Sequence, residues 1–199
     1  MLLVALSWWS GEEGGTAFTV HQWSGCAILS LLLFRLAWGV VGGEYARFSQ
    51  FVHGPARVLA ALRELLSPAA LARPGHNPLG AWMVLAFLLT LLVQTVTGLF
   101  ANDDIMNDGP LMEHISKDLS DTLSGVHELN FGILLALIGV HVLAIVYHRL
   151  RKGERLTRAM FTGYQTVSLT PPAARRASNW LALVLLAASA GMVALLIQL

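Results

Sequence analysis

The sequence predicts an all-α protein, a bundle of transmembrane helices. Of its 199 residues, 55% are hydrophobic and only 13% are charged, whereas a soluble domain carries about 25% charged residues. The mean hydropathy is +0.62. A membrane-spanning helix needs about 20 mostly apolar residues, and such runs occur at roughly 20–41, 80–100, 129–147 and 180–198. This composition excludes an ordinary soluble globule.

Two shorter segments complete the predicted bundle. The N-terminal MLLVALSWWS is apolar but too short to span, and it has neither the basic start nor the cleavage site of a signal peptide. We therefore expect a partial first helix, the end of a helix whose beginning is missing. The segment PARVLAALRELL begins at Pro55 and repeats apolar residues at helical spacing beside two arginines. This pattern predicts a short helix in the inner membrane interface.

Charged residues are unevenly distributed among the connections between the spans. Twelve of the thirteen lysines and arginines are Arg35 or lie in 42–78 and 149–176. The positive-inside rule places these on the cytoplasmic face. Segments 10–20 and 101–128 instead hold nine acidic residues and one lysine, which is typical of the outer face. The alternating direction of the helices agrees, so we expect a multi-pass protein of a bacterial inner (plasma) membrane.

Histidines near the spans are the candidate functional residues, because a metal-binding or ionisable side chain is costly in hydrocarbon. His21 stands at the outer end of the span 20–41, and His127 stands at the outer end of the span 129–147. Two histidines at one depth on different helices can bind opposite faces of one haem iron, since neutral imidazole is a good iron ligand. No CxxCH attachment motif is present, so any haem is expected to be non-covalent.

A second site is predicted at His141. It follows His127 by 14 residues, which on an α-helix is a shift of about 21 Å along the axis and about 40° around it. One helix would then serve two stacked haems, one near each leaflet. No second ligand for the inner haem is visible at that depth, because His148 is on the same helix and both His53 and His76 lie in the inner connection.

Other roles remain open for several histidines. His53 and His148 are expected to be interfacial residues, and for His76 capping or headgroup contact is as good an interpretation as a role near haem or quinone. Zinc or proton pathways use similar histidines. Zinc sites, however, recruit carboxylates or cysteines close by, and here only Glu128 is near, on a different side of the helix from His127.

Several short motifs resemble those of one family. They are HQWSG at 21–25, FRLAWG at 34–39, ARF at 46–48, GHNPLG at 75–80, GVHE at 125–128 and the histidine at 141. Together they resemble the bacterial cytochrome b561 and nickel-iron hydrogenase b-type cytochrome superfamily, from about Leu2 to Phe161. The resemblance implies a four-helix haem-binding domain in residues 1–161. Residues 162–199 are then a linker and an additional C-terminal transmembrane helix.

The resemblance also implies a ligand set. The family binds two b haems through two histidines each, so His21 is expected to pair with His127, and His141 is expected to serve the inner haem. The family's other inner ligand is a histidine in the first helix, which this sequence lacks. An N-terminal truncation is the simplest expectation, and it leaves the inner haem incomplete. Arg35 and Arg47 are candidates to neutralise haem propionates, with simple anchoring at the inner face as the alternative.

Three functions are compatible with these features. The leading interpretation is a b-type cytochrome that relays electrons between the quinone pool and a partner redox protein in a respiratory chain, without a catalytic site of its own. The resemblance implies a hydrogenase, another oxidoreductase or a c-type cytochrome as partner. Membrane lipid and quinone are further expected partners, and nucleic acid is not. The alternatives are a stand-alone quinone-linked oxidoreductase and a metal or proton transport protein.

Overall fold

The computed structural model describes residues 1–65, 78–152 and 176–198. The chain divides into two compact units: Met1–Trp38, Leu88–Leu134 and Ser178–Leu199 form the first, and Gly39–Phe87 and Leu135–Ala177 form the second. The described residues include four helices long and apolar enough to cross a membrane. These are Gly15–Val41, Pro78–Gly98, Lys117–Arg151 and Asn179–Leu196. The predicted all-α transmembrane fold is therefore confirmed.

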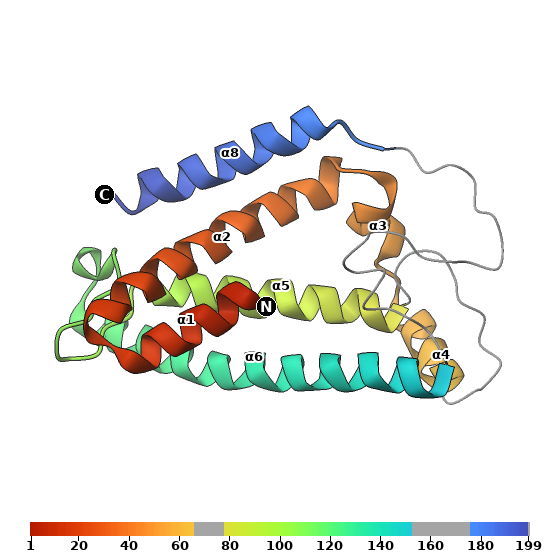
Figure 1. Ribbon diagram of the computed structural model, residues 1–199, viewed down its shortest axis with the longest axis horizontal. Helices are drawn as coiled ribbons and strands as arrows, with labels where there is room; N and C mark the ends of the chain where they lie inside the picture. Colours follow the sequence, from red (N-terminus) through yellow and green to blue (C-terminus); the bar gives the residue numbers. More distant parts are fainter. Residues whose placement is uncertain (66–77, 153–175, 199) are drawn as a thin grey trace. The chain divides into compact units, whose positions relative to one another are not determined.

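The first unit holds all or part of five helices (Figure 1). They are α1 (Leu2–Glu13), α2 (Phe18–Val41), α5 (Pro78–Gly98), α6 (Lys117–Lys152) and α8 (Asn179–Leu196). Gly14 and Gly15 join α1 to α2 with φ angles of 61° and 53°, values that glycine adopts without steric cost. Because the chain reverses there, the short α1 folds back along the beginning of α2.

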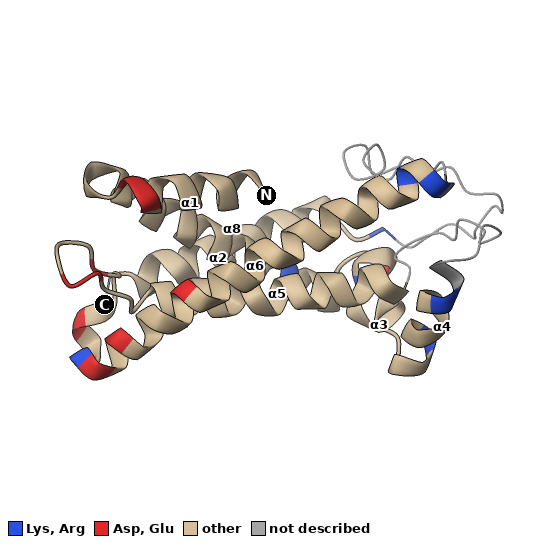
Figure 2. Cartoon of the chain, turned by 90° about the horizontal axis from the view of Figure 1, so that it is seen from below, with Lys and Arg blue, Asp and Glu red and all other residues tan. Residues whose placement is uncertain are grey.

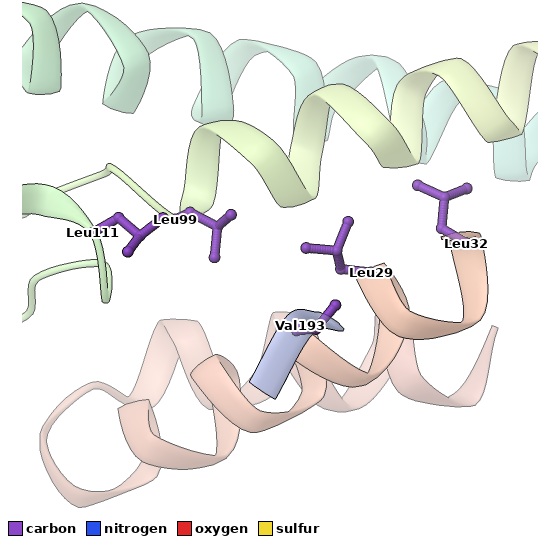
Figure 3. Close-up of a cluster of buried hydrophobic side chains, with 5 residues drawn as sticks. All are labelled: Leu29, Leu32, Leu99, Leu111 and Val193. Atoms are coloured by element: carbon purple, nitrogen blue, oxygen red, sulfur yellow. The ribbon is translucent and has the colours of Figure 1, made fainter. Parts of the chain in front are cut away.

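A small cluster of buried side chains joins three segments of the first unit. Leu29 and Leu32 of α2 pack with Leu99 and Leu111 of the connection after α5, and with Val193 of α8 (Figure 3). The additional C-terminal helix is thus joined to the rest of the first unit through Val193. Many other leucines of the membrane-spanning helices are exposed. This is expected for side chains that face lipid, because lipid tails are as apolar as leucine itself.

Helix α6 begins at Lys117, well before the apolar run predicted at 129–147. Its first turns are polar, and local electrostatics favour a helix there. Asp118 lies in the first turn, where a carboxylate interacts favourably with the helix dipole. Lys117 also forms an ion pair with Asp121, one turn further along the same helix. Helical structure therefore continues beyond the apolar segment.

The connection between α5 and α6 is ordered around the Asp103 carboxylate, which accepts three backbone N–H groups, each at 2.9 Å. These groups belong to Asn107, Ile105 and Met106. Because the bonds favour the ionised form, they hold the pKa of Asp103 well below its ordinary range. The side chain of Gln22 in α2 donates to the backbone oxygen of Asp108 at 2.8 Å. The connection is thereby fixed to α2.

The second unit contains α3 (Phe48–Phe51), α4 (Pro55–Leu65) and the remaining parts of α5 and α6. The helix predicted from Pro55 onward is confirmed as α4, and its position at a membrane interface stays a prediction. A Cβ added at Gly39 would lie 2.0 Å from the Phe48 ring, so glycine is needed for this close approach. The indole N–H of Trp82 donates to the backbone oxygen of His53 at 3.0 Å.

The charged residues of the two units differ in sign. Acidic residues of the first unit gather at the end of α1, in the connection after α5 and at the start of α6 (Figure 2). Described lysines and arginines of the second unit lie on α4 and at the end of α6, together with Arg47 before α3 and Arg176 before α8. Arg35 and Lys117 are basic residues of the first unit. The orientation of these charges in the membrane stays a prediction.

Candidate functional site

His21 lies near the start of α2 and faces α1. Its Nδ1 atom is 2.7 Å from the backbone oxygen of Ser7 and 3.3 Å from the Ser7 hydroxyl. The ring of Phe18 stacks on the imidazole, with ring centroids 5.4 Å apart and planes at 12°. A Cβ added at Gly11 would lie only 2.8 Å from the same nitrogen. The reversal between α1 and α2 therefore brings a carbonyl, a hydroxyl and a glycine against this ring.

His127 lies in α6, and its contacts with α5 closely resemble those of His21 with α1. Its Nδ1 atom is 2.9 Å from the backbone oxygen of Gln94 and 3.2 Å from the Thr97 hydroxyl. A Cβ added at Gly98, the last residue of α5, would lie 2.8 Å from the imidazole Cε1. Both histidines thus have Nδ1 at a backbone carbonyl and a hydroxyl of the adjacent helix, and both have a glycine against the ring.

These contacts determine which ring nitrogen carries the proton. A backbone carbonyl oxygen can only accept a hydrogen bond, so the short contact at Nδ1 requires an N–H at that position in both histidines. The other nitrogen, Nε2, then keeps its lone pair in the neutral ring. Metal-binding histidines are commonly fixed in this way, with one nitrogen donating to a carbonyl and the other ligating. Both rings are therefore in the tautomer that binds a metal through Nε2.

The two imidazoles lie near each other in the first unit. Their ring centroids are 6.2 Å apart, and the planes are inclined at 69°. Metal–imidazole bonds of about 2 Å on opposite sides of one metal separate the ring centroids by about 6 Å. A pocket of about 320 Å³ is lined by both histidines, by Gly11 and Gly98, and by Phe18. The pair thus has the spacing for a single metal between the rings.

A polar network supports the carbonyl that His127 uses. Asn130 is 7% exposed, and its side-chain amide donates to the backbone oxygen of Thr90 at 3.0 Å and to Gln94 Oε1 at 2.6 Å. Gln94 in turn accepts from His127 through its backbone oxygen. A buried amide that is fully engaged restricts the helices it joins. The network therefore holds α5 and α6 together beside the histidine.

The remaining predicted residues are not part of this pair. His141 lies in the second unit, where its ring meets Phe87 edge to face, with centroids 5.6 Å apart and planes at 88°. Arg35 lies in α2 of the first unit with its side chain partly buried, and Arg47 of the second unit donates through Nε to the backbone oxygen of Gly42 at 2.8 Å. His76 lies outside the described residues.

Within 1–65, 78–152 and 176–198, the structure places no group of three or more His, Cys, Asp or Glu side chains where they could hold a metal ion together. Among these residues, the paired site has two metal-binding side chains, His21 and His127.

Several groups that contact the two histidines cannot be recognised from the sequence. Two of them are backbone oxygens, which every residue type carries. The glycines at 11 and 98 and the hydroxyl of Thr97 are visible only as residues of apolar helices. One signal does exist: Thr90, Gln94 and Thr97 recur at helical spacing on one side of the span 80–100. A polar stripe on a transmembrane helix points to the bundle interior.

Comparison with known proteins gives one match. A model of the prokaryotic cytochrome b561 family matches residues 1–163. No curated protein and no solved structure was found to match. The matched region contains α1 to α6 and every histidine of the chain. The chain therefore belongs to the prokaryotic cytochrome b561 family, and it is a membrane b-type cytochrome that functions in electron transfer.

Proposed function

We propose that His21 and His127 bind opposite faces of one haem b, and that the protein uses this haem to pass electrons between the quinone pool and a partner redox protein. The partner is a hydrogenase, another oxidoreductase or a c-type cytochrome of a respiratory chain in the bacterial inner membrane. The protein acts as an electron-transfer subunit without a catalytic site of its own. This proposal rests on one observation: two imidazoles 6.2 Å apart, each with Nδ1 at a backbone carbonyl.

The donor set fits a haem for a chemical reason. A porphyrin supplies four nitrogens to the iron and leaves two further positions for protein ligands, which is the number of histidines that lie close together here. Haem b supplies a one-electron couple at the iron, and the axial ligands and their hydrogen bonds set its potential. The protein's own residues fix the tautomer and rotation of both rings, and Gly11 and Gly98 leave room for them.

We assign roles to the other predicted site residues as well. His141 is a ligand of a second, inner haem, in the second unit. Arg35 and Arg47 neutralise haem propionates, since a guanidinium is a permanently charged, planar donor. His76 contributes near a haem or a quinone. The contact of the His141 ring with Phe87 supports a fixed position of this imidazole within the second unit.

The decisive experiment is a reduced-minus-oxidised visible spectrum with haem quantitation of the chain purified from membranes. We expect a b-type spectrum in the wild type and loss of the paired-site haem in His21→Ala. The matched control is His114→Ala, which removes an exposed histidine of the first unit and should keep the full haem content. Absence of a b-type spectrum in the wild type, or equal haem content in all three proteins, would refute the proposal.

A further inference from the structure

We propose that the hydroxyl of Thr97 is a positioning residue that lowers the reduction potential of the haem bound by His127. It does so by sharing the Nδ1 proton of that histidine with the backbone oxygen of Gln94. The inference rests on the proposed function, because it requires His127 to be an iron ligand. It goes beyond that function because Thr97, which does not contact the metal, helps to determine the reduction potential.

The direction of the Thr97 hydrogen bonds follows from its surroundings. The hydroxyl lies 2.7 Å from the backbone oxygen of Val93 and 3.2 Å from that of Gln94, and a carbonyl can only accept. The single hydroxyl proton is therefore directed to a carbonyl of α5, and a lone pair of Oγ1 is left. His127 Nδ1, at 3.2 Å, is the donor that this lone pair accepts from.

The Nδ1 proton of His127 thus has two acceptors, the Gln94 carbonyl and the Thr97 hydroxyl. Thr97 is 6% exposed, so water does not readily replace the hydroxyl. Stronger hydrogen bonds from the Nδ1 proton to its acceptors make the imidazole a more basic ligand. A more basic axial ligand stabilises the oxidised iron relative to the reduced iron, which lowers the potential.

Thr97 is expected to affect the reduction potential more than Ser7, the residue whose hydroxyl lies near Nδ1 of His21. The Ser7 side chain is partly exposed, whereas Thr97 is buried, with 6% exposed. Water therefore competes less with the hydroxyl for the Nδ1 proton at His127.

The test is a potentiometric titration of the visible spectrum in Thr97→Val, Thr97→Ser and Ser189→Ala. Thr97→Val removes the hydroxyl with little change of shape, and Thr97→Ser keeps it. Ser189→Ala removes a different buried hydroxyl, which in α8 is bound to the carbonyl of Leu185 at 2.8 Å. The component to follow is the one that disappears in His127→Ala.

We expect Thr97→Val to raise the potential of that component, with the wild-type potential kept in both Thr97→Ser and Ser189→Ala. The ratio of reduced to oxidised haem at a fixed ambient potential should rise roughly threefold, which for a one-electron couple is about 30 mV. Loss of this haem in Thr97→Val alone, with rescue in Thr97→Ser, would equally support positioning by the hydroxyl.

Two results would overturn the inference. One is an unchanged or lowered potential in Thr97→Val, and the other is an equal effect of Thr97→Val and Thr97→Ser. Failure of the proposed function gives a different outcome, since the wild-type spectrum would then lack a b-type component or His127→Ala would leave it unchanged. The two failures are therefore distinguishable in the same set of proteins.

Discussion

Histidine rings are held by different means in the two units. In the first unit, His21 and His127 place Nδ1 at backbone carbonyls, 2.7 and 2.9 Å away. In the second unit, His141 lies edge to face against Phe87. An aromatic contact limits where a ring lies but leaves its protonated nitrogen undetermined, whereas a carbonyl fixes both the rotation and the tautomer. The first unit therefore fixes the orientation of both imidazoles, whereas the contact at His141 does not.

The largest effect expected from this difference is on haem content. His127→Ala should remove the haem of the first unit, because one of its two axial ligands is lost. His141→Ala should leave that component intact, since its ring belongs to the other unit. The haem-to-protein ratio and the reduced-minus-oxidised spectrum of both variants measure this. Loss of the same component in both proteins would mean that the two units do not hold independent sites.

A smaller effect is expected from filling the space beside a preformed ligand. In Gly98→Ala the new Cβ would lie 2.8 Å from His127 Cε1, so the ring must leave the position in which Nδ1 meets the Gln94 carbonyl. Disturbing the groups that orient a metal ligand costs about 10–100-fold in affinity, and we expect haem retention to fall by a factor in that range. Haem retention during dilution in detergent provides the measurement.

The matched control for this glycine is Gly132→Ala. An added Cβ at Gly132 of α6 meets no atom within 4 Å. This variant should therefore retain haem as the wild type does. Equal retention in Gly98→Ala and Gly132→Ala would show that the close approach at Gly98 does not constrain the ligand.

The next effect concerns stability. Asn130→Leu removes the amide bonds to the Thr90 carbonyl and to Gln94 Oε1. Hydrogen bonds between membrane helices average about 0.6 kcal/mol, with a maximum of about 1.7 kcal/mol, so we expect a loss of about 1–2 kcal/mol. Unfolding in mixed detergent measures it. Leu129→Ala, at a neighbouring residue that is 70% exposed, should cost less, and the reverse order would contradict a structural role of this network.

The smallest effect is a pH dependence in the connection after α5. The pKa of Asp103 is lowered in the folded protein, so its ionised carboxylate contributes stability above the ordinary aspartate pKa of about 3.9. That contribution is lost as the pH falls through the lower folded value. The difference in Tm between wild type and Asp103→Ala should therefore be constant near neutral pH and shrink below about pH 4.

The control for the carboxylate is Glu113→Ala, which removes another exposed acidic residue of the same connection. Its Tm difference from the wild type should be smaller at neutral pH than that of Asp103→Ala. A Tm difference for Asp103→Ala that grows as the pH falls would have the wrong sign. It would show that the three backbone N–H bonds do not stabilise the folded connection.

Much of the fold could be predicted because it depends on composition and periodicity. The long apolar runs at 20–41, 80–100, 129–147 and 180–198 correspond to α2, α5, α6 and α8. The helix from Pro55 was found from the spacing of its apolar residues. The start of α6 at Lys117 could not be found in the same way, because its first turns are polar and are stabilised by charges near the helix terminus.

The candidate site could be predicted only in part. The juxtaposition of His21 and His127 followed from equal depth on two helices, and the structure brings the two rings close together. The groups that orient them could not be predicted, because two are main-chain oxygens and the others are glycines and a threonine that also occur in ordinary spans. The ligand roles of His21, His127 and His141 stay predictions, as do the roles of Arg35, Arg47 and His76.

The carbonyls at the two histidines also bear on how the site assembles. His21 is oriented by Ser7 of α1, and His127 by Gln94 of α5, so each uses the helix that directly precedes its own in the first unit. Each helical hairpin can therefore orient its histidine as soon as the two helices pack together. Joining the two hairpins then brings together two imidazoles whose rotation is already fixed, without a rearrangement of either ring.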